Sequence, residues 1–154
     1  MSEPLLFANV GWMNRYEGEF EDDPTLGSHG WLKGHKWGHE AWNFKPSRGK
    51  VYGYVPARSN KINLNKLGAD ARDESLDGVT FIFIAREPRS KEARIVGWHR
   101  NATVYRVAGS LTLRRAPGVE VNYQIVANEL NATLLPTVQR TFRIPTAKVP
   151  GNLG

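Results

Sequence analysis

An unbroken apolar run between residues 78 and 85 most constrains how this chain can fold. It reads Gly-Val-Thr-Phe-Ile-Phe-Ile-Ala, and Gly78 and Pro88 bound it. A short apolar run closed by turn residues is typical of a strand buried at the centre of a sheet. We therefore expect the run to form the central strand of a single core, in which the buried side chains are Val79, Phe81, Phe83 and Ile95.

Several shorter extended segments surround this run. Residues 51–55 alternate as a strand does, and residues 5–10, 94–98 and 120–127 are also predicted to be strands. Residues 62–67 favour a short helix that would end near Gly68, and residues 12–16 favour a turn or one helical turn, so a few short helices are expected. Because strands outnumber helices, we expect an α+β or mainly β protein with a strongly curved mixed sheet or a small barrel.

The length of 154 residues fits one domain, over residues 1–154. Residues 148–154 carry neither a capped helix nor a charged tail, so we interpret the chain as the N-terminal module of a longer protein. The chain has no cysteine and no apolar run near the roughly 20 residues that cross a bilayer, and its first residues, Met-Ser-Glu-Pro, predict no signal peptide. We expect a cytoplasmic protein that makes no contact with a membrane.

Positive charge is concentrated after residue 40. The net charge is +6, and the part of the chain after residue 40 holds 18 of the 21 basic residues but only 8 of the 15 acidic ones. A basic body of this kind indicates a nucleic-acid partner, although a basic protein without such a partner has the same composition. The acidic, glycine-rich segment 17–34 precedes it, and its role stays open.

The stretch 94–106 combines flat aromatic faces with fixed positive charge. Two extended runs are predicted there, joined by the polar residues 99–101. Trp98 and Tyr105 offer π faces, and Asn101 offers an amide donor and acceptor. Such residues suit a pocket for a planar ligand beside a polyanion. The alternative is a core strand with its tryptophan inside and its arginines in solvent.

The sequence gives little support for a metal site or for catalysis. His35 and His39 are four residues apart, but they lack the HExxH order, so no metal site is expected. The chain has no cysteine nucleophile, GxSxG elbow or phosphate-binding P-loop. Glu40 or Glu129 could act as a base, but nothing marks either one. We therefore expect a domain without enzymatic activity and without a cofactor.

Three stretches of the chain resemble the PUA-like superfamily, which includes the EVE, YTH and ASCH domains. They are Trp42-Asn43-Phe44 followed by a basic turn and residues 51–55, then residues 81–98, and then residues 121–135. Residues 97–106, with 8–13 and 52–55, also look like N-terminal modules of bacterial proteins that carry an HNH nuclease domain. The resemblance implies a PUA-like fold and a module that reads a modified base in double-stranded DNA, as in modification-dependent restriction. The sequence departs from EVE and YTH domains before residue 42.

A reader of this kind flips the base out of the duplex, which costs about a few kcal/mol, and stacking returns roughly 1–3 kcal/mol per base. The residues that would line the base pocket, as stacking walls or edge readers, are Trp42, Asn43, Tyr54, Trp98, Asn101 and Tyr105. Those that would hold phosphates are Lys45, Arg48, Lys50, Arg100 and Arg106. The alternatives are a YTH-type RNA reader, a small ASCH-like enzyme acting on nucleotides and a protein-interaction module.

Overall fold

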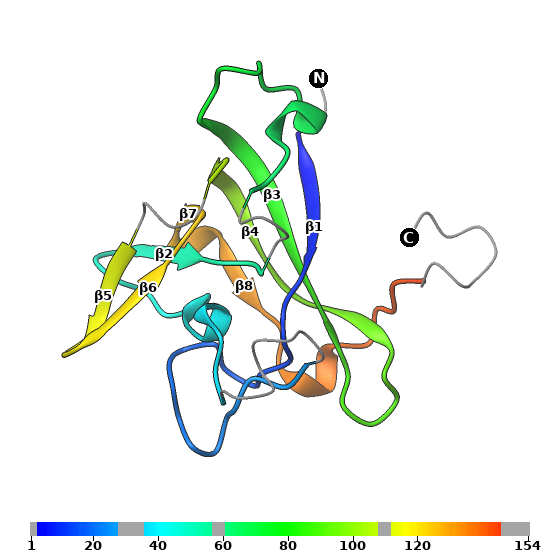
Figure 1. The fold of residues 1–154 in the computed structure, drawn as a ribbon. Coiled ribbons are helices and arrows are strands. Elements are labelled where there is room, and N and C mark those ends of the chain that lie inside the picture. Colours follow the sequence, from blue (N-terminus) through cyan, green and yellow to red (C-terminus); the bar gives the residue numbers. More distant parts are fainter. Residues whose placement is uncertain (1–2, 28–35, 57–60, 108–111, 146–154) are drawn as a thin grey trace.

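The computed structural model describes residues 3–27, 36–56, 61–107 and 112–145 (Figure 1). These residues form eight strands and four short 3₁₀-helices. The strands are β1 (Leu5–Asn9), β2 (Lys50–Gly53), β3 (Ser75–Arg86), β4 (Ala93–Tyr105), β5 (Thr112–Ala116), β6 (Val119–Asn122), β7 (Ile125–Asn128) and β8 (Ala132–Leu134). The helices are η2 (His39–Trp42), η4 (Leu64–Leu67), η5 (Glu129–Asn131) and η6 (Thr137–Gln139).

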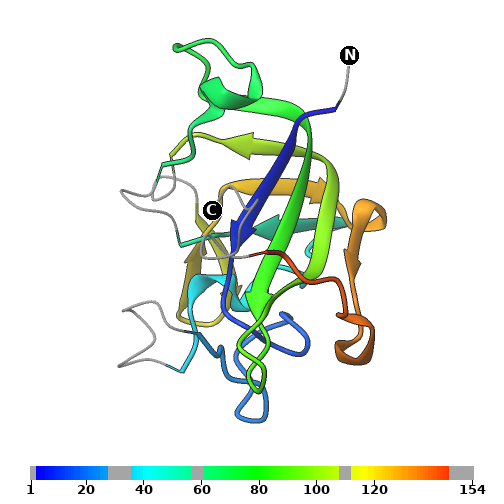
Figure 2. The same ribbon diagram turned by 90° about the vertical axis from the view of Figure 1, so that its right-hand side faces the viewer.

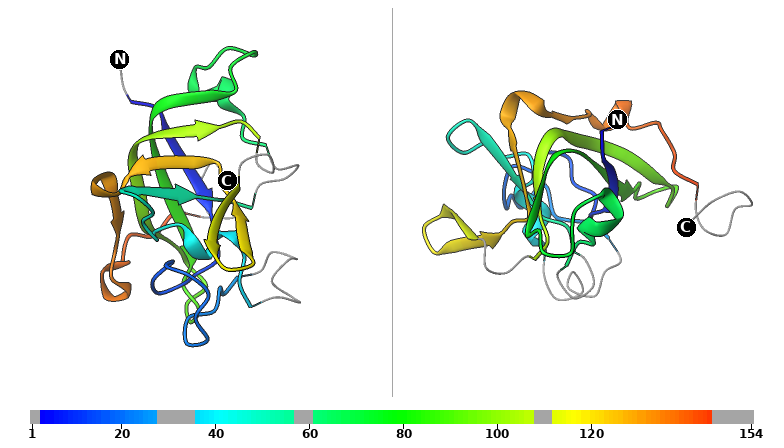
Figure 3. Two further views of the ribbon diagram at one scale, coloured as in Figure 1. Left: turned by 90° about the vertical axis from the view of Figure 1, so that its left-hand side faces the viewer. Right: turned by 90° about the horizontal axis from the view of Figure 1, so that it is seen from above.

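One curved sheet organises the molecule (Figures 2 and 3). Its strand order is β1-β3-β4-β7-β2, and β8 pairs with residues 97–99 of β4. β1 runs parallel to β3, whereas the other pairs are antiparallel, so the sheet is mixed as expected. In the described part of the chain its edge strands β1 and β2 do not pair, and the sheet stays open rather than closing into a barrel. The β5–β6 hairpin projects from its side (Figure 1).

The core lies inside the curve of the sheet. Val79, Phe81 and Phe83 are fully buried, as predicted from the apolar run. The prediction for Ile95 is wrong, because Ile95 is half-buried and its neighbour Val96 is buried instead. The register explains this: Phe83 pairs with Gly97 but Ile84 pairs with Ile95, which leaves Val96 as an extra residue turned towards the core.

β4 is one strand of 13 residues and not two extended runs with a polar joint. The polar residues 99–101 form a second bulge against β3. Val79 pairs with Ala102 and Phe81 with His99, so β4 uses one residue more than β3 between these pairs. Asn101 takes a left-handed conformation there, with φ of +49°, which asparagine tolerates better than most residues.

The predicted strand 120–127 is two strands. β6 pairs only with β5, whereas β7 lies between β4 and β2, and the chain changes partner at residues 123 and 124. The predicted strand 51–55 ends earlier, at Gly53, because the Asn43 side chain takes the hydrogen bonds of the Tyr54 backbone. The short helix is confirmed as η4 and ends at Gly68, whose φ is +100°.

One buried arginine ties the two ends of the described chain together. Arg140 donates from Nη1 to the Met13 carbonyl at 2.6 Å and from Nη2 to the Asn14 carbonyl at 2.9 Å. Its guanidinium also lies 4.8 Å from the ring centre of Trp12. Among the described residues, no helix has the length and apolar character that a membrane crossing needs.

Candidate nucleic-acid interface

Residues 45–50 form an exposed basic turn. Ser47 and Lys50 close it with backbone hydrogen bonds of 2.7 and 3.1 Å, and Arg48 takes the left-handed conformation at its tip. Lys45, Arg48 and Lys50 are all exposed. None of the three makes an ion pair with a described residue. Their charge is therefore available to an anion such as a phosphate.

Arg115 of β5 fixes this basic turn to the aromatic residues beside it. Its guanidinium donates to the carbonyls of Lys45 at 3.1 Å and of Trp42 and Tyr52 at 3.3 Å. It also lies 5.7 Å from the ring centres of both Trp42 and Tyr52. Burial lowers the pKa of Arg115 to about 10, so the group stays charged at neutral pH. Cation–π contact and hydrogen bonding together hold the β5–β6 hairpin against the turn.

Three half-exposed tyrosines meet next to the basic turn and form what we call the tyrosine triad. Tyr52 lies on β2, Tyr105 at the end of β4, and Tyr123 in the break between β6 and β7. The Tyr123 ring centre lies 5.0 Å from that of Tyr52 and 6.5 Å from that of Tyr105, in edge-to-face geometry. Burial, together with the neighbouring phenols, raises the pKa of Tyr123. Tyr123 therefore stays neutral at physiological pH.

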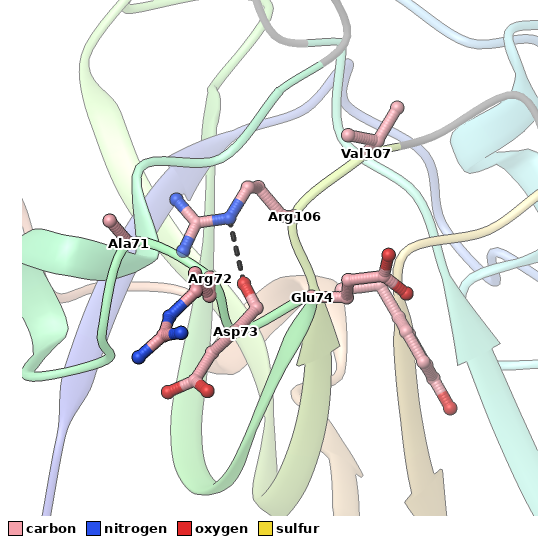
Figure 4. A pocket seen from close by; sticks show the side chains of 7 residues that line it. Ala71, Arg72, Asp73, Glu74, Arg106 and Val107 are labelled. Carbon is pink, nitrogen blue, oxygen red and sulfur yellow. Dashed lines mark hydrogen bonds between the residues drawn. The ribbon is translucent and has the colours of Figure 1, made fainter.

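A cavity of about 550 Å³ has Tyr105 of the triad in its wall. Figure 4 shows the residues that line this cavity. This size falls within the usual range for small-ligand sites. Tyr105 belongs both to the triad and to the wall of this cavity. The other lining residues come from the loop before β3 and from the end of β4, and they are Ala71, Arg72, Asp73, Glu74, Arg106 and Val107.

Arg106 shapes this cavity with hydrogen bonds to its own protein. It donates from Nε to the Asp73 carbonyl at 2.8 Å, from Nη1 to Asn65 Oδ1 at 2.8 Å and from Nη2 to the Asp70 carbonyl at 3.0 Å. The bond to Asp73 is drawn in Figure 4. All three acceptors are uncharged, so Arg106 keeps its positive charge beside the cavity, while these bonds hold its geometry.

Trp42, Asn43 and Tyr54, three of the predicted pocket residues, do come together where η2 meets β2. Trp42 is 9% exposed and belongs to the core. The Asn43 amide donates to the Tyr54 carbonyl at 3.0 Å and accepts from the Tyr54 N–H at 2.8 Å. The Tyr54 ring lies 5.0 Å from the His39 ring. In this arrangement Asn43 positions the end of β2 and has no amide atom left over for a base edge.

Trp98 and Asn101 lie elsewhere. Trp98 is half-buried between Ile82 and Thr133 on the neighbouring strands. It faces away from the core, because the adjacent His99 is fully buried and contacts Phe44 on the inner side. Trp42 and Trp98 therefore do not face each other. Asn101 and Arg100 are exposed beside an open depression that Glu3, Gly78 and Asn131 complete.

The described residues do not bring metal ligands together in one site. His39 Nδ1 accepts the Asn122 N–H at 3.0 Å, and its sequence partner His35 lies outside the described residues. Within the part of the chain that the structure describes, no group of three or more His, Asp or Glu could hold a metal. The structure describes the acidic segment 17–34 only as far as residue 27. Within that part, Asp22 forms an ion pair with Arg15 at 2.7 Å.

The sequence did not identify Tyr123 and Arg115 as site residues. The polar run Asn122-Tyr123-Gln124 interrupts the apolar pattern of 119–127, and this interruption is the signal that could have located Tyr123. Arg115 had no comparable signal, because its role depends on the hairpin packing against β2. Comparison with protein-family models, with curated proteins and with solved structures finds no match to this chain.

Proposed function

We propose that this domain binds nucleic acid and reads one base that has left the base stack. The observation that carries the proposal is the contact between the tyrosine triad and the basic turn, which Arg115 bridges. Aromatic faces beside unpaired cations are what an extruded base and its flanking phosphates require. Tyr105 connects the triad to a cavity of about 550 Å³, which is large enough for one nucleobase.

The free energies of base extrusion, stacking and phosphate contact are consistent with separate roles for the tyrosine triad and the basic turn. Extrusion of a base from a duplex costs about a few kcal/mol, and stacking on an aromatic side chain returns roughly 1–3 kcal/mol. The net affinity then has to come from phosphates, whose neutralisation by Lys45, Arg48 and Lys50 releases counterions. These contacts position the nucleic acid but carry no sequence information. Selectivity therefore belongs to the triad and its cavity.

The more specific form of the proposal is that the ligand is double-stranded DNA with one modified base. The module would then serve as the specificity domain of a modification-dependent restriction system. The support is the resemblance of residues 97–106 to modules that precede HNH nucleases, together with the PUA-like order of elements. An open, strongly curved mixed sheet is compatible with that architecture.

Single-stranded RNA is a second candidate. The observation that favours it is the open position of Tyr52 and Tyr123, which are half-exposed on the sheet surface rather than enclosed. Single-stranded bases stack on such surfaces without first leaving a duplex. An RNA ligand would therefore need the triad but not the cavity.

The test is a panel of nucleic-acid ligands that are bound to the wild-type domain and to the variant Tyr105→Ala. The ligands are duplexes that differ in one modified base, the plain duplex, and the matching single strands of DNA and RNA. We expect the wild-type domain to prefer one modified duplex, and Tyr105→Ala to lose about tenfold or more of that preference while binding to the plain duplex persists. Equal affinity for all duplexes together with tighter binding to RNA would favour the RNA reader. Absence of binding to every ligand would overturn the proposal.

A further inference from the structure

Gln124 has a buried carboxamide that makes no hydrogen bond to any described residue. The side chain is fully buried, and among the described residues neither Nε2 nor Oε1 has a hydrogen-bond partner. Leaving a buried donor and acceptor unsatisfied is costly, so each such group in a folded protein needs an explanation. Gln124 leaves two atoms unsatisfied at once.

The position of Gln124 is at the centre of the proposed interface. Its carbonyl accepts the Tyr105 N–H at 2.7 Å, and its own N–H donates to the Gly53 carbonyl at 2.8 Å. It also directly follows Tyr123 in the chain. The backbone of Gln124 thus lies between the two strands that carry Tyr105 and Tyr52, and all three members of the triad surround this segment.

We propose that the Gln124 carboxamide is the specificity-determining group of the proposed reader, and that it hydrogen-bonds to the edge of the extruded base. A carboxamide offers one donor and one acceptor side by side, which matches the paired donor and acceptor on a nucleobase edge. The base reaches the amide when a ring of the triad turns aside. Tyr123 is the ring placed for this, since it lies in the break between β6 and β7 rather than within a strand.

The unpaired amide is then a cost that the free domain bears and that ligand binding removes. A site built to hydrogen-bond its ligand rejects an analogue that lacks the matching groups, because its own polar atoms are then left unpaired. The inference rests on the proposed function, and it specifies which residue recognises the base edge.

Two variants with opposite expected effects on stability make the test. Gln124→Met keeps the length of the side chain but removes the unpaired amide, so we expect its Tm to rise by about 4 °C or more. The matched control is Asn43→Leu, because Asn43 is equally buried but has both amide atoms bonded to Tyr54. We expect the Tm of this control to fall.

Binding is measured with duplexes that carry either the preferred base or a nonpolar isostere of the same shape at one position. We expect the wild type to prefer the hydrogen-bonding base by about tenfold or more, which corresponds to one good base contact. Gln124→Met should bind both duplexes with the same affinity. A lower Tm for Gln124→Met, or an undiminished preference, overturns the role of Gln124 alone. Failure of the wild type to bind any nucleic acid overturns the proposed function as well.

Discussion

Side chains of the same type have different roles in this domain according to where their hydrogen bonds go. Asn43 and Gln124 are both buried amides, but Asn43 is fully bonded to Tyr54 and Gln124 has no partner among the described residues. Arg106 and Arg48 were both predicted to bind phosphate, yet Arg106 is engaged with its own loop while Arg48 is exposed. Residue type and spacing could identify these residues as polar or charged, but only the fold decides which of them stay available.

His99 gives a residue-scale prediction about pH. It is fully buried, and its Nε2 hydrogen-bonds to the Asn43 carbonyl at 3.0 Å. Burial lowers the pKa of His99 to about 3, against an unfolded value near 6.5. As pH falls below about 6.5, the unfolded chain takes up a proton at His99 and the folded domain does not. Stability should therefore decline towards pH 3, by about 2 kcal/mol already at pH 5 relative to pH 8.

Thermal melting of the wild type and His99→Gln at pH 8 and pH 5 checks this. The variant should be less stable at pH 8, because a fully packed ring is lost, but its Tm should change much less between the two pH values. Both proteins carry the same carboxylates, so the difference between their changes in Tm isolates His99. An equal loss of Tm in both proteins would mean that His99 is not the titrating group.

At the element scale, the sequence predicts which strands exist better than where they end. The apolar run 78–85 and the alternation at 51–55 predicted β3 and β2, because both patterns are local. The end of β2 depends on Asn43, and the break at residue 123 depends on the partners of β6 and β7. These are contacts between distant segments, so no local pattern carries them. Arg115 was missed for the same reason, because its role depends on its contacts with β2.

The close packing of β4 against β8 gives a prediction about Gly97. A Cβ at this position would lie 2.5 Å from the Thr133 carbonyl oxygen and 2.8 Å from Phe44 Cζ. Gly97→Ala must therefore push β8 away from β4 or displace Phe44 in the core. We expect a loss of about 1–3 kcal/mol in the free energy of unfolding, measured by denaturant titration. Faster amide exchange at Leu135, which bonds to the Val96 carbonyl at 2.9 Å, would locate the damage at β8. Unchanged stability would contradict the close approach of these strands.

At the scale of the whole molecule, charge and curvature act together. The sheet curls around one core, and Arg115 links the β5–β6 hairpin to β2 at the edge of the sheet. The acidic residues before residue 40 pair in part with local cations, as Asp22 does with Arg15 and Glu21 with Lys36. The surplus of positive charge after residue 40 is what the proposed nucleic-acid partner would neutralise. Composition alone favours such a partner, and the fold adds an aromatic surface next to the basic turn.

The salt dependence of binding to a labelled DNA duplex tests the central claim most directly. Each phosphate that a cation neutralises contributes about −0.9 to the slope of log Kobs against log salt concentration. We expect a steep slope for the wild type and a slope flatter by about 2–3 for the triple variant Lys45→Ala, Arg48→Ala, Lys50→Ala. The matched control, Arg89→Ala with Lys91→Ala, changes two exposed cations at the tip of the β3–β4 hairpin and should leave the slope nearly unchanged. Equal slopes for the wild type and the triple variant would contradict the account.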